Sequence, residues 1–81
     1  MKVIRIGASW CSSCLIMKSR VDEVLNEIPK IEILNYDYDF DSEKVEEYNV
    51  GDVLPVYIRL DNNERLIGEK SKEEIKEFFN R

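Results

Sequence analysis

Histidine is absent from the 81-residue chain, and its absence excludes several classes of chemistry. Without an imidazole, one copy of the chain has no Cys–His nucleophile, no imidazole acid–base catalyst and no histidine ligand for a metal. Cysteine is also scarce, with two residues, so a zinc or iron–sulfur site of four ligands would need two copies of the chain. We therefore predict that one copy of the chain holds no metal.

The sequence also lacks a long uninterrupted hydrophobic run and an excess of basic residues. No segment is long and apolar enough for a signal peptide or a membrane span, which favours a cytoplasmic location and no membrane partner. Twelve Lys and Arg against seventeen Asp and Glu give a net charge of −5, which disfavours nucleic acid as a partner. No linker, repeat or low-complexity tract interrupts the chain. We expect one domain over residues 1–81 and a monomer.

The hydrophobic pattern predicts alternating strands and helices. Short apolar runs indicate strands, and apolar residues at three- and four-residue spacing from Cys11 to Ile28 indicate an amphipathic helix. The expected elements are strand 3–6, helix 11–28, strand 31–36, helix 42–47, strand 56–60, strand 65–68 and helix 72–79. Asn62-Asn63 fits a tight hairpin turn with positive φ angles, and Ser71 with Glu74 fits a capping box.

The order βαβαββα predicts an α/β fold with a four-stranded mixed sheet and three helices on both faces. The strand–helix–strand unit at the start implies a right-handed crossover between parallel strands. The hairpin near the end adds two antiparallel strands to the same sheet.

Cys11 and Cys14 carry the main functional signal. A Cys-x-x-Cys pair between a strand and a helix indicates dithiol chemistry, because the free N–H groups and dipole of the helix N-terminus stabilise a thiolate on the first cysteine. Cys11 is therefore the expected nucleophile. Cys14, one helical turn further and facing the core, is the expected resolving thiol. The alternative interpretation is that two small hydrophobic residues happen to lie near a helix start.

The segment Trp10-Cys11-Ser12-Ser13-Cys14 resembles the tryptophan and active-site dithiol of the thioredoxin family. Val53-Leu54-Pro55 is similar to that family's cis-proline segment, and Ile67-Gly68 resembles the strand edge that completes its substrate groove. The resemblance implies a thioredoxin fold without the extra N-terminal strand and helix of ordinary thioredoxins. The size is then close to that of small archaeal-type thioredoxins and of glutaredoxins.

The resemblance implies a thiol–disulfide oxidoreductase that reduces the disulfides of partner proteins and carries electrons. Cys11 would attack the partner's disulfide, Cys14 would resolve the mixed disulfide, and a thioredoxin-reductase-like donor would reduce the resulting Cys11–Cys14 disulfide. This redox-active disulfide takes the place of a cofactor. The residues expected to line the substrate groove are Trp10, Ser12, Ser13, Leu54, Pro55, Ile67 and Gly68.

Arg5 is the main departure from the family pattern, because thioredoxins carry a buried aspartate six residues before the first cysteine. The lysine usually near that aspartate corresponds to Ile33. Arg5 is thus the candidate for tuning the redox potential of the dithiol. We expect it to bury its aliphatic stem and to carry its charge to solvent or to a surface acid, so that its field at Cys14 is weak.

Two alternative functions remain open. A glutaredoxin-like reductase linked to glutathione is disfavoured by Leu54, which replaces the threonine or valine common before the glutaredoxin proline. The paired glycines of a glutathione site are also missing after Gly68. A non-catalytic binding module would keep the fold and use the groove beside Trp10 and Pro55 to dock a partner without turnover.

Overall fold

The computed structural model describes residues 1–81 and has the element order β1–α1–β2–α2–β3–β4–α3. The strands are β1 (Lys2–Gly7), β2 (Glu32–Asp37), β3 (Val56–Arg59) and β4 (Arg65–Ile67), and the helices are α1 (Ser12–Glu27), α2 (Ser42–Glu47) and α3 (Lys72–Asn80). The element order predicted from the sequence is confirmed. None of the three helices has the length and apolar character needed to span a membrane.

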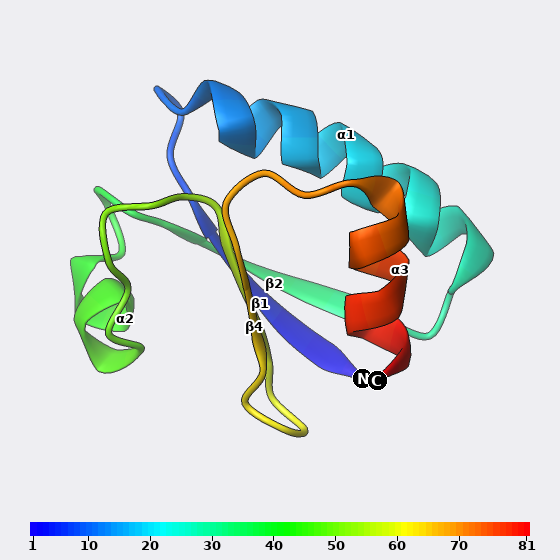
Figure 1. The fold of residues 1–81 in the computed structure, drawn as a ribbon. Coiled ribbons are helices and arrows are strands. Elements are labelled where there is room, and N and C mark those ends of the chain that lie inside the picture. The colour runs from blue at the N-terminus through cyan, green and yellow to red at the C-terminus, as the bar shows by residue number, and fades with distance from the viewer.

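The four strands form one mixed sheet in the order β2-β1-β3-β4. β1 runs parallel to β2, whereas β3 is antiparallel to both β1 and β4. Figure 1 shows α1 and α3 together on one side of this sheet and α2 on the other. The predicted α/β architecture, with three helices on both faces, is therefore confirmed.

Alternation along β1 supplies the core on both faces of the sheet, because successive side chains of a strand point to opposite sides. Val3 belongs to the cluster under α1 and α3, and Ile4 and Ile6 belong to the cluster on the side of α2. The other buried residues of the first cluster are Met17, Val21, Val24, Tyr57, Leu66, Ile75, Phe78 and Phe79. The sheet is therefore held between two apolar layers, and α1 begins shortly after the C-terminal end of the interior strand β1.

Helix ends follow the sequence signals with one exception. The Ser71–Glu74 capping box at the start of α3 is present, and Asn49 after α2 has a left-handed φ of 52°. Asp41 precedes α2, but its side chain makes no capping bond to the helix. Its Oδ2 atom instead accepts the main-chain N–H of Asp37, at 2.7 Å. Asp41 thereby ties the end of β2 to the start of α2.

The hairpin between β3 and β4 differs from the prediction. Only Asn63 of the Asn62-Asn63 pair has a positive φ, of 60°, so the turn is longer than a two-residue turn of type I′. Arg59 is only 4% exposed, whereas Leu60 is 41% exposed, against the alternation expected for this strand. The strand ends at Arg59, which frees Leu60 from the alternating pattern.

Arg59 is buried because it binds the end of α3. One of its terminal nitrogens donates to the main-chain oxygens of Phe78, at 2.8 Å, and Arg81, at 3.0 Å. Two other nitrogens of the same guanidinium bind the carboxylate of Asp61 at 3.0 and 2.6 Å. The last carbonyls of a helix have no partner within the helix, and Arg59 satisfies two of them at the C-terminus of α3.

We expect Arg59→Ala to lower the free energy of unfolding by about 2–4 kcal/mol, because it truncates a buried side chain and leaves a buried carbonyl without a donor. Urea unfolding followed by circular dichroism measures the loss. Arg81→Ala is the control, since its side chain is 44% exposed and pairs only with exposed acids, so its substitution should cost less than about 1 kcal/mol. Equal losses for the two variants would contradict the role given to Arg59.

Candidate active site

Cys11 is the N-cap residue of α1. Its backbone is extended, with φ of −96° and ψ of 109°, and its main-chain N–H donates to the oxygen of Ala8 at 3.2 Å. Its Sγ atom accepts the main-chain N–H of Cys14, also at 3.2 Å. The sulfur therefore takes the capping place usually filled by a hydroxyl or carboxylate oxygen, at the positive end of the helix dipole.

Cys14 lies in the first turn of α1 and faces the end of β1. A Cβ atom on Gly7 would approach the Cys14 Sγ to 3.3 Å, so the glycine allows the helix to lie close to the strand. Both thiols are free. The sequence prediction singled out neither the close approach nor Gly7, although a glycine directly before a motif at a strand end is a signal for it.

The Cys14 thiol is held in its protonated form. Burial raises its pKa from 9.0 to about 11, and the hydrogen bond and charge of Cys11 act in the same direction, against a smaller lowering by the Ala8 backbone. Cys11 and Cys14 are both only partly buried. Cys14 is thus less enclosed than its core-facing position suggested, and its raised pKa is the clearer difference.

Iodoacetamide at neutral pH is expected to alkylate Cys11 well before Cys14. Alkylation requires a thiolate, and the raised pKa leaves Cys14 almost wholly protonated under these conditions. Peptide mass spectrometry of short time points gives the order of labelling. Unfolding in urea is the control, because it removes the burial of Cys14 and should make the two rates similar. Equal labelling in the native protein would show that the two roles are wrongly assigned.

The Leu54–Pro55 segment lies opposite Cys11. The Leu54–Pro55 peptide bond is cis, and the Leu54 carbonyl oxygen is 3.9 Å from the Cys11 Sγ. The Pro55 carbonyl accepts the N–H of Gly68 at 2.9 Å. Gly68 has a φ of +82°, which a residue with a side chain rarely adopts, and lies against Val53. The structure thus brings together Cys11, Leu54-Pro55 and Gly68, which are far apart in the sequence.

Trp10 lies at the surface next to Cys11 and is 64% exposed. Its ring nitrogen donates to the Asp39 carboxylate at 2.7 Å, and its ring meets that of Tyr38 edge to face, with centroids 6.3 Å apart. The loop after β2 therefore fixes the indole orientation. The sequence prediction missed this role of Asp39, which no local pattern reveals.

The remaining residues predicted for the groove make no hydrogen bond to a cysteine sulfur. Ser12 is exposed and Ser13 is partly buried, and neither hydroxyl makes a hydrogen bond to a cysteine sulfur. Ile67 is 46% exposed at the end of β4. Leu15, directly after Cys14, and Val53, directly before Leu54, are also exposed apolar side chains, at 65% and 58%.

Arg5 lies in β1 between Asn35 of β2 and Tyr57 of β3. Its Nε donates to the Asn35 Oδ1 at 2.7 Å, and the guanidinium carbon is 5.9 Å from the centre of the Tyr57 ring. The Nη1 atom is buried without a hydrogen-bond partner. Arg5 makes no ion pair, so of the two destinations expected for its charge, solvent or a surface acid, the acid is not there. The reason is the register, which places a neutral amide directly beside Arg5.

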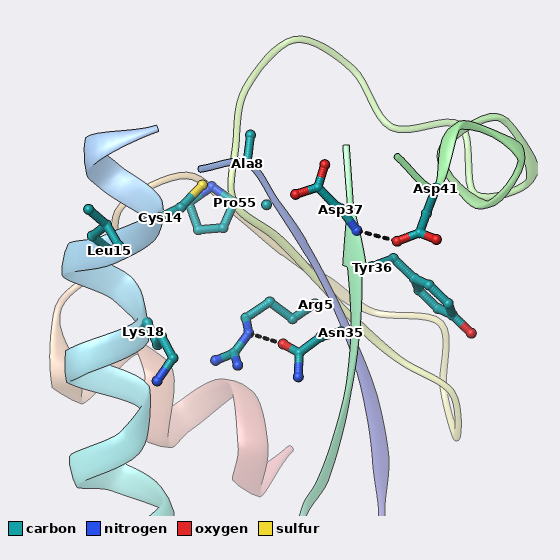
Figure 2. Close-up of a pocket in the computed structure, with 11 residues that line it drawn as sticks. Arg5, Ala8, Cys14, Leu15, Lys18, Asn35, Tyr36, Asp37, Asp41 and Pro55 are labelled. Atoms are coloured by element: carbon teal, nitrogen blue, oxygen red, sulfur yellow. Dashed lines mark hydrogen bonds between the residues drawn. The ribbon is translucent and has the colours of Figure 1, made fainter. Parts of the chain in front are cut away.

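A cavity of about 390 Å³ opens beside Cys14. Figure 2 shows Cys14 and Leu15 along the helix side of this cavity, with Arg5, Lys18 and Asn35 at one end. Pro55, Ala8 and Gly7 also line it, as do Tyr36, Asp37 and Asp41. No group of three or more Cys, Asp or Glu side chains is placed to hold a metal ion. The sequence did not predict that Lys18 and Asn35 line this cavity, because that depends on how α1 lies relative to β2.

Comparison with known proteins gives one consistent family. The family model described as Thioredoxin matches residues 1–81. A thioredoxin from Chlamydia pneumoniae is 28% identical over 76 residues, which cover 91% of this chain and 74% of that protein. An H-type thioredoxin from Fagopyrum esculentum is 30% identical over 74 residues, which cover 88% of this chain and 63% of that protein. The chain thus spans about two thirds to three quarters of the length of these relatives.

Solved structures agree with this family in fold. A thioredoxin from Fasciola hepatica is 26% identical and superposes with a TM-score of 0.81, covering 99% of this chain and 78% of that one. Mitochondrial thioredoxin 3 from Saccharomyces cerevisiae is 18% identical, with a TM-score of 0.85 and coverage of 98% and 76%. At such identity the second likeness concerns the fold alone.

Proposed function

The chain belongs to the thioredoxin family, and we propose that it uses its dithiol to reduce disulfides of partner proteins. As a family member with two neighbouring cysteines, it is in general terms a thiol–disulfide oxidoreductase. The observation that carries the finer proposal is the 3.2 Å hydrogen bond from the Cys14 N–H to the Cys11 sulfur. A main-chain donor aimed at sulfur stabilises the thiolate, which is the attacking species in disulfide exchange.

The proposed reaction has two exchange steps. The Cys11 thiolate attacks one sulfur of the partner's disulfide, forms a mixed disulfide and releases the partner's other sulfur as a thiolate. Cys14 then loses its proton and attacks the Cys11 Sγ, which closes the intramolecular disulfide and releases the partner's remaining sulfur. Two electrons pass to the partner. Thioredoxins do this with their own cysteine pair and no cofactor.

The Leu54-Pro55 segment supports docking of an extended partner chain. The Leu54 carbonyl faces the Cys11 sulfur at 3.9 Å, and the Gly68 N–H is used internally by the Pro55 carbonyl. Because Leu54 is only 6% exposed, its proposed part is limited to main-chain pairing with the partner's backbone beside the disulfide. The exposed indole of Trp10, held by Asp39, offers an apolar contact on the other side of Cys11.

Repeated turnover requires that the oxidised dithiol be reduced again. The Cys11–Cys14 disulfide formed in turnover needs an external reductant, and we assign this part to a thioredoxin-reductase-like enzyme. We also propose that the protein acts as a monomer in the cytoplasm, with one thioredoxin-like domain over residues 1–81. Membership of the family supports the disulfide substrates and the reductase-like donor.

Reduction of insulin by dithiothreitol tests the proposed activity. The wild-type protein should accelerate precipitation of the reduced insulin chain about tenfold or more, because a thiolate at a helix N-terminus attacks faster than a free dithiol. Cys11→Ser should return the rate to that of dithiothreitol alone. Ser19→Ala is the matched control and should stay active, since Ser19 is an exposed serine of the same helix that does not belong to the site. A wild-type protein without acceleration would be a binding module instead.

A further inference from the structure

The lining of the cavity beside Cys14 has two cationic and two acidic side chains, in a chain whose net charge is −5. Arg5 and Lys18 line it, and Arg5 has no acidic partner. Lys18 pairs with Asp22 at 3.2 Å, but both side chains are more than half exposed, at 58% and 54%. Such a pair contributes little and leaves the Lys18 ammonium free to turn toward another anion.

The two acids of the cavity wall are already used by the main chain. Asp37 Oδ1 accepts the N–H groups of Asp39 and Phe40, at 2.8 and 3.1 Å. Asp41 Oδ2 accepts the N–H of Asp37 at 2.7 Å. Figure 2 shows both acids at the end of the cavity away from Arg5 and Lys18. They therefore fix the turn after β2 and leave the guanidinium without a counter-charge.

The end of the cavity at Arg5 and Lys18 lacks a negative charge, and a small oxyanion would supply it. A guanidinium that is partly removed from water and has no acid beside it is costly, and a bound anion offsets that cost. The planar guanidinium suits phosphate or carboxylate oxygens, and an ammonium adds a second positive charge. A space of about 390 Å³ holds an ion of this size together with water.

No carboxylate is among the groups that act on the Cys14 thiol. Arg5 and Lys18 carry positive charge, and Asp37 and Asp41 are bound to main-chain amides. Tyr57 faces Arg5 from β3, and its hydroxyl is buried and without a partner. Burial raises the pKa of Tyr57, which disfavours the ionised form that would act as a base.

We propose that this cavity binds a small oxyanion of the phosphate or carbonate class between Arg5 and Lys18, where it accepts the proton of Cys14. The transfer of the proton, unlike the binding of the anion, rests on the proposed function. Hydrogen phosphate takes the thiol proton and becomes dihydrogen phosphate, and the Cys14 thiolate attacks the Cys11 Sγ. The bond between Cys11 and the partner's sulfur breaks, and that sulfur leaves as a thiolate. Arg5 and Lys18 thus hold an external base in place of one supplied by the chain.

Binding is tested on the reduced protein with inorganic phosphate, followed by phosphorus NMR in a zwitterionic buffer. The wild type should show saturable binding, weakened about tenfold in Arg5→Gln and about threefold in Lys18→Gln. Lys76→Gln is the matched control, because Lys76 also pairs with a carboxylate of α1, that of Glu27 at 2.8 Å, but does not line the cavity. Lys18 is exposed, so its variant should fold. No saturable binding, or equal binding by all variants, overturns the site.

Proton acceptance is tested separately with the disulfide dithiobis(nitrobenzoate), whose reduction releases thionitrobenzoate in two phases. The first phase is attack by Cys11, and the second is attack by Cys14 on the mixed disulfide. At constant pH and ionic strength, phosphate should accelerate the second phase about threefold or more, saturating over the range in which it binds. Repeating the measurement with bicarbonate in place of phosphate shows which of the two anions accelerates the second phase.

Sulfate is the control anion for this step, because it has the same shape and charge as hydrogen phosphate but is a very weak base near neutral pH. It should compete with phosphate and suppress the acceleration. Binding without any change in the second phase overturns proton acceptance. Loss of the first phase would instead contradict the proposed function, so the two failures differ.

Discussion

Replacing Cys14 by Ser should convert the protein into a trap that holds its partner covalently on Cys11. The variant keeps the attacking sulfur at the N-cap of α1 and the main-chain N–H of residue 14 that it accepts. It lacks the second sulfur that would attack Cys11, so the mixed disulfide can be released only by outside thiols. Insulin reduction at low dithiothreitol should fall about 100-fold or more, while the adduct survives on non-reducing gels.

Cys11→Ser and the double variant are the controls for this trap. Cys11→Ser keeps the burial that is the largest cause of the raised Cys14 pKa, so Cys14 should form almost no adduct at neutral pH. The double variant should form none. Dithiothreitol must release the partner trapped by Cys14→Ser, since the bond is a disulfide. Adducts of equal yield on the two single variants would show that Cys14, and not Cys11 alone, attacks partners.

The element order could be predicted because it depends on local patterns. Apolar spacing along α1 placed Met17, Val21 and Val24 in the core, where the structure has them. The position of the dithiol at the start of that helix followed from the same pattern. Local patterns also gave the capping box at Ser71, because its two partners are three residues apart.

The surroundings of the dithiol could not be predicted, because they depend on register and on contacts between distant segments. The partner of Arg5 is Asn35, 30 residues away, and becomes its neighbour only through the parallel register of β1 and β2. Asp39 is 29 residues from Trp10 in the sequence, and the two side chains likewise meet only in the folded chain. The burial of Arg59 is similar, since its partners are main-chain oxygens at the end of α3, which have no sequence signature.

Resolution of the mixed disulfide should be strongly dependent on pH when no oxyanion is present. Burial is the largest cause of the raised Cys14 pKa, and it persists after Cys11 has been consumed in the mixed disulfide. Between pH 7 and 9 Cys14 is then below its pKa, and its thiolate fraction grows about tenfold per pH unit. In zwitterionic buffer, the second phase of thionitrobenzoate release should therefore become faster by up to about 100-fold over this range.

Arg5→Ala is the variant that separates the field of the guanidinium from its binding of an anion. Arg5 is not among the groups that shift the Cys14 pKa, and its nearest bonded partner is the neutral amide of Asn35. Without oxyanions, the variant should therefore keep the same slope, with rates within about threefold of the wild type at each pH. A rate that levels off between pH 7 and 8 in the wild type would place the Cys14 pKa near neutrality. A slope that changes with Arg5→Ala would mean that the guanidinium itself acts on the dithiol.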